Sequence, residues 1–408
     1  MRIVILHYAA PPVIGGVERV IYHHATILAE DGCDVHVVAG RGEPFAPDVT
    51  FHRVELVDSR HPEILAIKAE LDAGRVPVPD FEALVGRILD ALRAIVSDDD
   101  VVIAHNVLSL HKNLPLTAAL HRLTQGGNGP SLIAWHHDLA WKSARYLTEM
   151  HDGYPWDLLR QPWPHVRHVT VSEARRHDVA KLFGLPLEAI AVVPGGVDTF
   201  ALLGISPAFQ GLLRQIGIPD ADPVLLLPAR ITRRKNIEFA LHVTAALREA
   251  YYPQAALIVT GPPGPHNPEN QRYFAELKQM RSALGLTDSV HFLADLIEGG
   301  PDDDMMRGLY RLADALILPS YEEGFGLPVL EAAIARLPIF CSDIPPFREL
   351  AGEQATYFSL QADPGEAADA VYRVLRGDRV AVLRRRVLNH YDWYLIVHRY
   401  VKPLLNYE

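Results

Sequence analysis

The chain has 408 residues, of which 49% are hydrophobic and 22% are charged. One hydrophobic core rarely organises a chain of this length, so two domains of about 200 residues each are expected. The composition is that of an ordinary folded protein and excludes the disordered and fibrous classes. The formal net charge of -11 gives the surface no general attraction to nucleic acid, so we expect no nucleic-acid partner.

The cysteine usage and the N-terminal segment predict a cytoplasmic protein. Only Cys33 and Cys341 are present, without metal-ligand spacing, which is typical of a reducing compartment. The opening sequence MRIVILHYAAPP lacks the long apolar region of a signal peptide, and no apolar run approaches the length of a membrane span. Basic side chains such as Arg175, Arg176 and Lys181 are more typical of a solvated helix face, which leaves at most a weak peripheral membrane contact.

Short β-branched runs alternate with longer segments of helical periodicity, and this alternation predicts an α/β fold with parallel sheets. The expected strands of the first half are residues 2–6, 35–39, 101–104, 132–135, 168–171 and 190–193. Those of the second half are residues 223–227, 256–260, 290–293, 315–318 and 339–342. Each series is sufficient for one Rossmann-like domain.

The domain boundary is expected near residue 205, because residues 194–222 are rich in Gly and Pro and break the periodicity. The interpretation is an N-terminal Rossmann-like domain over residues 1–204, a C-terminal one over 205–385, and a tail helix over 386–408 that packs back toward the N-terminal domain. Residues 58–79 show no clear pattern and fit either a mobile loop or a helix. The acidic runs at 98–100 and 302–304 are typical of solvated loops.

The segment PSYEEGFGLPVLE, residues 319–331, follows an expected strand and leads into a helix. Pro328 suits the first turn, so the helix is expected to begin around Leu327. Gly324 and Gly326 permit close backbone approach, and a helix N-terminus favours a phosphate. Glu323 is placed to face a sugar and Glu331 to bind a ribose diol. The alternative for Glu331 is a simple interaction with the helix dipole.

A second segment, LLLPARITRRKN at residues 225–236, places cations at the end of a buried strand. Arg230 and Lys235 lie five residues apart across a turn, a reach suited to gripping a diphosphate through charge-assisted hydrogen bonds. Arg233 and Arg234 are expected to be solvent-exposed.

Together the two segments resemble the donor site of retaining glycosyltransferases of family 4, in glycosyltransferase group 1. In that family an Arg and a Lys bind the donor diphosphate, and two Glu with seven residues between them contact sugar and ribose. Arg230, Lys235, Glu323 and Glu331 match this pattern. The segments GGVE (15–18), VPGGVD (193–198) and SDIPPFREL (342–350) extend the resemblance over nearly the whole chain, although Gly195 stands where many relatives have Asn.

The resemblance implies the GT-B architecture, in which two Rossmann-like domains face each other across a cleft. It further implies donor contacts by Gly15, Gly16, Phe325 and Leu327, and a histidine that contacts the transferred sugar. His136 and His137 both follow the strand at 132–135. We predict that His137 is catalytic and that His136 lines the donor site, although the sequence leaves open which ring faces the sugar. His105 and Asn106 end another strand and are candidates for the acceptor side.

The expected chemistry is metal-independent transfer with retention of configuration. No acidic pair is placed as a metal site after a strand, so Arg230, Lys235 and the helix dipole would stabilise the leaving diphosphate. The resemblance implies same-face attack by the acceptor without a covalent intermediate. We therefore expect no metal and no cofactor, with the nucleotide sugar acting as a substrate.

Donor and acceptor are the open parts of the hypothesis. UDP-glucose and GDP-mannose are the leading donors, and Leu296 is expected to border the base. The acceptor is a glycan, a small metabolite or a lipid-linked molecule. Two alternatives share the architecture: a sugar-nucleotide epimerase or hydrolase, which needs no acceptor, and a binding protein without catalytic activity.

Overall fold

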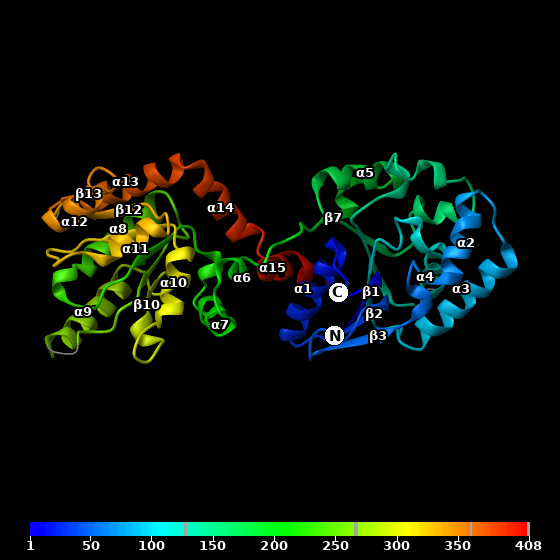
Figure 1. Cartoon of the computed structure of the whole chain (residues 1–408), viewed down its shortest axis with the longest axis horizontal. Coiled ribbons are helices and arrows are strands. Elements are labelled where there is room, and N and C mark those ends of the chain that lie inside the picture. Colours follow the sequence, from blue (N-terminus) through cyan, green and yellow to red (C-terminus); the bar gives the residue numbers. More distant parts are fainter. Residues whose placement is uncertain (126–128, 265–267, 360, 406–408) are drawn as a thin grey trace. The chain divides into compact units, whose positions relative to one another are not determined.

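The computed structural model describes residues 1–125, 129–264, 268–359 and 361–405, and the chain divides into two compact units (Figure 1). The first unit comprises Met1–Gly196 and Trp393–Glu408, and the second comprises Val197–Asp392. The boundaries expected from the sequence, residues 205 and 386, differ from these by a few residues. Among the described helices, none is long and apolar enough to cross a membrane.

The first unit contains a seven-stranded sheet in the order β3-β2-β1-β4-β5-β6-β7, and every pairing is parallel. Chain order therefore reverses direction between β1 and β4. The strands are β1 (Arg2–Ala9), β2 (Asp34–Arg41), β3 (Val49–Arg53), β4 (Val101–His105), β5 (Ser131–His136), β6 (Val166–Thr170) and β7 (Ile190–Val192).

Side chains alternate across this sheet, so each face has its own core. Val4 and Leu6 of β1 pack with α2 (Pro62–Asp72), α3 (Val78–Arg93) and α4 (Leu114–Thr124). Ile3 and Ile5 pack on the other face with α1 (Gly16–Glu30) and the tail. The tail consists of α15 (Trp393–Ile396), a π turn (Val397–Val401) and α16 (Lys402–Leu405), and α5 (Glu173–Phe183) lies beside β6 and β7.

The second unit contains a six-stranded sheet in the order β10-β9-β8-β11-β12-β13, again parallel throughout, with its reversal between β8 and β11. The strands are β8 (Val224–Leu227), β9 (Ala256–Val259), β10 (Val290–Phe292), β11 (Ala315–Leu318), β12 (Ile339–Ser342) and β13 (Thr356–Phe358).

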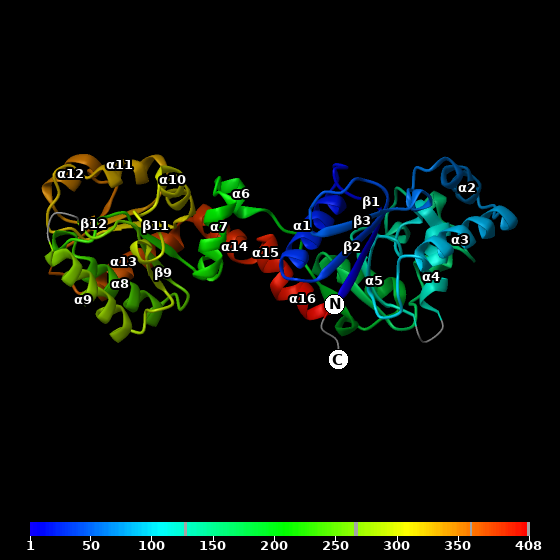
Figure 2. The same cartoon turned by 90° about the horizontal axis from the view of Figure 1, so that it is seen from below.

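Helices cover both faces of the second sheet, as Figure 2 shows. One face packs against α8 (Ile237–Ala250), α9 (Glu269–Ala283) and α13 (Pro364–Gly377). The other packs against α7 (Pro207–Gln215), α10 (Asp303–Leu312), α11 (Leu327–Ile334) and α12 (Pro345–Ala351). The remaining helices are α6 (Thr199–Leu203) and α14 (Arg379–His390).

The predicted fold class is confirmed, with corrections to individual elements. The sequence misses β3 and β13, which are short, partly exposed edge strands without a strong apolar run. In residues 58–79 the helical alternative is correct, because α2 and the start of α3 lie there. The solvated-loop prediction is wrong for Asp100, which is buried and accepts a 2.6 Å bond from Arg2 Nη1. In the second run Asp302 is exposed and precedes α10 as its N-cap, as expected of a solvated loop, whereas the exposed Asp303 and Asp304 belong to the first turn of the helix.

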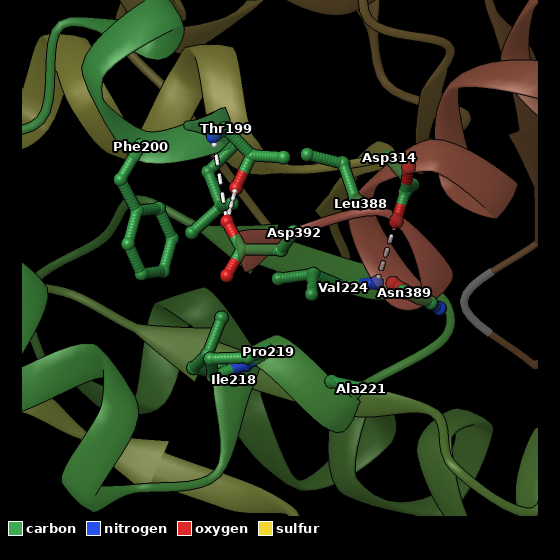
Figure 3. A pocket seen from close by; sticks show the side chains of 11 residues that line it. Thr199, Phe200, Ile218, Pro219, Ala221, Val224, Asp314, Leu388, Asn389 and Asp392 are labelled. Carbon is green, nitrogen blue, oxygen red and sulfur yellow. Dashed lines mark hydrogen bonds between the residues drawn. The ribbon is translucent and has the colours of Figure 1, made fainter. Parts of the chain in front are cut away.

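Two segments distant in sequence lie side by side at one end of the second unit. The Val197 amide donates to the Tyr391 carbonyl at 2.8 Å, and the Thr199 hydroxyl bonds the buried Asp392 carboxylate. Figure 3 shows the Thr199 and Asp392 side chains beside a cavity of about 20 Å³, room for roughly one water molecule. Asp314, at the same cavity, accepts a bond from the Val224 amide at 2.9 Å. These hydrogen bonds hold the first residues of the second unit, 197–199, against its last residues, 391–392.

Candidate functional site

The point at which the second sheet reverses its strand order positions the candidate site. Ligands of open α/β sheets bind outside the carboxyl ends of the two strands at such a point. Here those strands are β8 and β11, which pair in register through Leu225 with Ala315 and Leu226 with Leu316. The loop with the four cations follows β8, and the Gly-rich loop follows β11. The fold therefore brings together the two segments that the sequence singled out.

Glu323 is held by side chains from both loops. Its Oε1 accepts a bond from Lys235 Nζ and a 2.8 Å bond from the Ser320 hydroxyl. Lys235 and Glu323 are both mostly buried, with side chains 10% and 9% exposed. Arg234 Nη1 lies 3.5 Å from the second oxygen, Oε2. These partners fix the orientation of the carboxylate.

Ser320 and the backbone beside it were not recognised from the sequence. The Ser320 side chain is buried, and its carbonyl accepts a 2.5 Å bond from the Ser342 hydroxyl at the end of β12. The Tyr321 amide donates to the Arg234 carbonyl at 2.8 Å, which joins the two loops directly. Ser320 lies three residues before Glu323 in the same motif. This short spacing was the sequence feature from which their contact could have been predicted.

The other cations of the loop differ in how they are paired. Arg230 is exposed and its guanidinium has no partner in the described part of the chain. Arg233 and Arg234 are exposed, as expected, but both have partners: Arg233 bonds Glu276 at 2.6 Å and lies over the Tyr273 ring, and Arg234 bonds the Glu322 carbonyl. Arg230 is therefore available for an anion, whereas Arg233 is already neutralised.

The Gly-rich loop ends where the sequence predicted, because α11 begins at Leu327 with Pro328 in its first turn. Gly324, Phe325 and Leu327 are exposed, and Gly326 has φ of 102°. Pro328 has no amide hydrogen and the Val329 amide donates to the Gly326 carbonyl, so this turn offers fewer free amides than a helix start without proline.

Gly326 and Gly324 differ in what a side chain would meet, and this difference gives a prediction. A Cβ at Gly326 would lie 2.9 Å from Phe347 Cε1 in a left-handed backbone, whereas one at Gly324 would meet nothing within 4 Å. We expect Gly326→Ala to lower the free energy of unfolding by about 1–3 kcal/mol. Gly324→Ala is the matched control and should leave the urea midpoint unchanged. Equal midpoints for the two variants would contradict this reading of the loop.

Glu331 is exposed on α11, and one of its oxygens accepts a bond from the hydroxyl of Tyr310 on α10. Burial and this bond raise the pKa of Tyr310, so the phenol stays protonated and remains a donor. Tyr310 and Glu331 line a hollow that also includes Arg307, Arg311 and Arg336. Leu296 is 40% exposed and is not among the residues that line this hollow.

In the first unit, Gly15 is the N-cap of α1 and Gly16 is its first residue. A Cβ at Gly15 would lie 2.0 Å from Glu18 Oε2, whereas one at Gly16 would meet nothing within 4 Å. Gly15 therefore makes room for the Glu18 carboxylate, and the GGVE segment places an acidic group near the carboxyl end of β1.

His136 and His137 have different surroundings. His136 ends β5, is buried, and shares a 2.9 Å hydrogen bond with His168. His137 is partly exposed, and its Nε2 lies 3.0 Å from His105 Nδ1. Burial lowers the pKa of His137 to about 3 and that of His136 well below its usual range. Both rings are therefore neutral near pH 7, and His137 is the more accessible of the two.

Asn106 orients the loop that carries His137. Its side-chain oxygen accepts bonds from the His137 and Asp138 amides at 2.9 and 3.1 Å. Asn106 has φ of 59°, and both it and His105 are buried. The sequence had placed these two residues on the acceptor side from their strand-end position. The structure places both in contact with the His137 segment, and their position on the acceptor side stays a prediction.

One group of possible metal ligands lies in the described residues: Asp72, His111 and Glu149. Lys68 Nζ donates to the carboxylate of Asp72 and, at 2.9 Å, to that of Glu149. The ammonium group bridges the two carboxylates and neutralises part of their charge, and His111 Nε2 also contacts Glu149. The arrangement is therefore an internal ion-pair cluster.

Two family models match the chain in succession. Residues 14–200 match "Glycosyltransferase Family 4", and residues 210–388 match "Glycosyl transferases group 1". Mannosylglucosylglycerate synthase of Thermotoga maritima is 23% identical over 85% of this chain and 83% of its own. Glycogen synthase of Mycobacterium tuberculosis is 24% identical over 96% and 92%. The solved structure of sucrose-phosphate synthase from Thermosynechococcus elongatus is 17% identical, covers 99% and 98%, and has a TM-score of 0.40.

The two parallel-sheet α/β domains and the two family-model matches define an enzyme of the glycosyltransferase class with GT-B architecture. Within that class the chain belongs to glycosyltransferase group 1, family 4. The family predicted from the sequence is confirmed. The roles of individual residues stay predictions.

Proposed function

We propose that this enzyme transfers a hexose from a nucleoside diphosphate sugar to an acceptor hydroxyl, with retention of configuration and without a metal ion. The observation that carries the proposal is the arrangement at the β8–β11 reversal. A buried Lys235–Glu323 pair and an unpaired Arg230 lie there beside the start of α11. Such a group binds an anion on its cations and a sugar hydroxyl on its carboxylate.

In the proposed complex Arg230 and Lys235 hold the diphosphate, with the amides of the Gly-rich loop. Charge develops on the diphosphate as the sugar departs, and preorganised cations stabilise it at that moment. Glu323, held by Ser320 and Lys235, accepts hydrogen bonds from sugar hydroxyls. Glu331 binds the ribose, and its bond to Tyr310 keeps its carboxylate in place.

The first unit supplies the acceptor side of the reaction in this proposal. Neutral His137 donates or accepts one hydrogen bond at the transferred sugar, with its ring position set by His105. We assign His136 a structural role because its ring is buried against His168. Gly16 leaves space for the donor phosphates, because a Cβ there would meet nothing within 4 Å, whereas the space over Gly15 is taken by the Glu18 carboxylate. The departing phosphate oxygen takes the acceptor's proton, so the protein needs no separate base.

UDP-glucose and GDP-mannose are the proposed donors, and the names of the two curated relatives refer to mannosyl-containing and glucan products. The test is a thermal-shift screen of UDP, GDP, ADP and their sugar conjugates, with and without EDTA. A ligand at 100 times its Kd stabilises by about 2.7 kcal/mol, which is measurable as a shift. We expect a response to one base that EDTA leaves unchanged. A response abolished by EDTA would contradict metal independence, and no response to any nucleotide would contradict the function.

A further inference from the structure

The first unit has a hollow of about 390 Å³ where β1 and β2 end, a volume within the range of small-molecule sites. We call it the β1–β2 hollow. Its chemistry-bearing lining residues are His7, Glu18, Arg41, Arg60, Lys68 and Lys112. Four of these six are cations, in a chain whose net charge is -11. The lining of this hollow is therefore locally cationic although the chain as a whole is acidic.

Two of the four cations are already neutralised in part. Lys68 bonds the carboxylates of Asp72 and Glu149. Arg41 Nε lies 2.8 Å from Asp58 Oδ2, and this contact uses one of its three nitrogens. Asp58 also accepts a 2.9 Å bond from the Arg60 amide. One buried carboxylate therefore positions both arginines at the hollow.

The other two cations have no carboxylate partner in the described ranges. The Arg60 guanidinium is exposed and makes no side-chain contact there. Lys112 is partly exposed, and its Nζ lies 4.4 Å from the centre of the Tyr146 ring. A cation over an aromatic face keeps its hydrogen-bond donors free for a ligand. The hollow therefore offers positively charged donors that no carboxylate pairs with in the described ranges: the side chains of Arg60 and Lys112 and the terminal nitrogens of Arg41.

Glu18 gives the same hollow one acceptor for hydroxyl groups. Its carboxylate lies over Gly15, which has no side chain to displace it. A purely anionic ligand would be repelled by Glu18, and a neutral sugar would leave the cations unpaired. A small molecule with an anionic group at one end and hydroxyls at the other satisfies both.

We propose that the β1–β2 hollow binds the acceptor, and that the acceptor is a sugar or polyol carrying a phosphate or a carboxylate. The inference rests on the proposed transferase function, because it assigns the acceptor of that reaction. Arg60 and Lys112 bind the anionic group, Arg41 assists, and Glu18 accepts a hydrogen bond from a hydroxyl. The opposing interpretation is that Arg60 and Lys112 are solvated surface cations.

The test uses three matched probes on the full chain: glucose 6-phosphate, glucuronate and glucose. Titration calorimetry at low and high salt should show the anionic probes binding at least about tenfold more tightly than glucose, with the advantage lost at high salt. Arg60→Gln and Lys112→Gln should each weaken the anionic probes by about tenfold and leave glucose unchanged. Arg93→Gln, an exposed arginine of α3 outside the hollow, is the control.

The outcomes distinguish a phosphate from a carboxylate as the anionic group. They also distinguish failure of the acceptor assignment from failure of the proposed transferase function. Tighter binding of glucose 6-phosphate alone identifies a phosphate, and equal gains for glucuronate identify any anion. The inference is overturned if the anionic probes bind no more tightly than glucose. It is also overturned if neither Arg60→Gln nor Lys112→Gln weakens the binding of the anionic probes. Slow release of nucleoside diphosphate from the donor alone is measured in parallel. If that release persists while the anion preference is absent, the acceptor assignment fails while the proposed donor-site chemistry is retained.

Discussion

Replacing Lys235 by alanine is expected to lower kcat/KM by a factor on the order of 10²–10³. The substitution removes a cation proposed to stabilise the leaving diphosphate. It also leaves the mostly buried Glu323 carboxylate with only Ser320 and the more distant Arg234 as partners. Initial rates of nucleoside diphosphate release, measured with and without acceptor, give the comparison.

The matched control for Lys235 is Arg233→Ala in the same loop. Arg233 carries the same charge but is already bonded to Glu276, so its loss should change kcat/KM by no more than a few-fold. Urea midpoints for both variants separate a catalytic effect from lost stability. If Lys235→Ala keeps its rate within about twofold of the parent enzyme, the donor-site assignment is wrong.

The second large effect is acid unfolding that begins below pH 6.5. Burial lowers the pKa of several first-unit histidines, to about 4 for His7 and His168 and about 3 for His24 and His137, while those of His105 and His136 also fall well below the ordinary value. The unfolded chain takes up protons near pH 6.5 and the folded chain does not. Stability is therefore fully present above pH 6.5 and is lost as the pH falls toward 4.

The slope of this loss is about 1.4 kcal/mol per pH unit for each such histidine. Six of them would remove a typical stability of about 5–15 kcal/mol within about 0.5–2 pH units, so we expect acid unfolding between about pH 4.5 and 6. Urea unfolding measured from pH 8 to pH 5 gives the slope directly. A free energy of unfolding that stays constant over that range would contradict the assignment.

His24 is the best position to test the cause. It is fully buried, and both ring nitrogens lack a partner in the described structure. His24→Phe should reduce the proton uptake on unfolding by about one and flatten the pH dependence correspondingly. The exposed His242 is the control, and His242→Gln should leave the slope as it is. Identical slopes for the two variants would show that buried His24 does not titrate as proposed.

The sequence predicted most of the fold because buried strands of parallel sheets are continuous apolar runs. The strands at 315–318 and 339–342 coincide with β11 and β12. It failed where burial is partial, as in β3 and β13 at the sheet edges. The helix α2 was ambiguous because its polar and apolar residues do not separate cleanly along the chain.

The candidate site was predictable wherever its residues share one segment. Lys235 and Glu323 each belong to a contiguous motif, and the parallel pairing of β8 with β11 brings the motifs together. The contacts of Glu331 with Tyr310 and of Gly326 with Phe347 were not predictable, since each joins two separate elements of the chain. The cationic β1–β2 hollow was missed for the same reason. Arg41, Arg60 and Lys112 are scattered in sequence and meet only in the fold.

The return of the chain to the first unit has a consequence for biosynthesis. Trp393, Ile396 and Val401 complete a core whose other members, such as Ile3 and Ile21, are translated before the second unit. The second unit, by contrast, is one uninterrupted stretch. During translation the second unit can therefore fold before residues 393–405 have been synthesised. Until then the apolar surface of the first unit that these residues cover stays exposed. An excised first unit would need residues 393–405 spliced onto Gly196 to be folded stably.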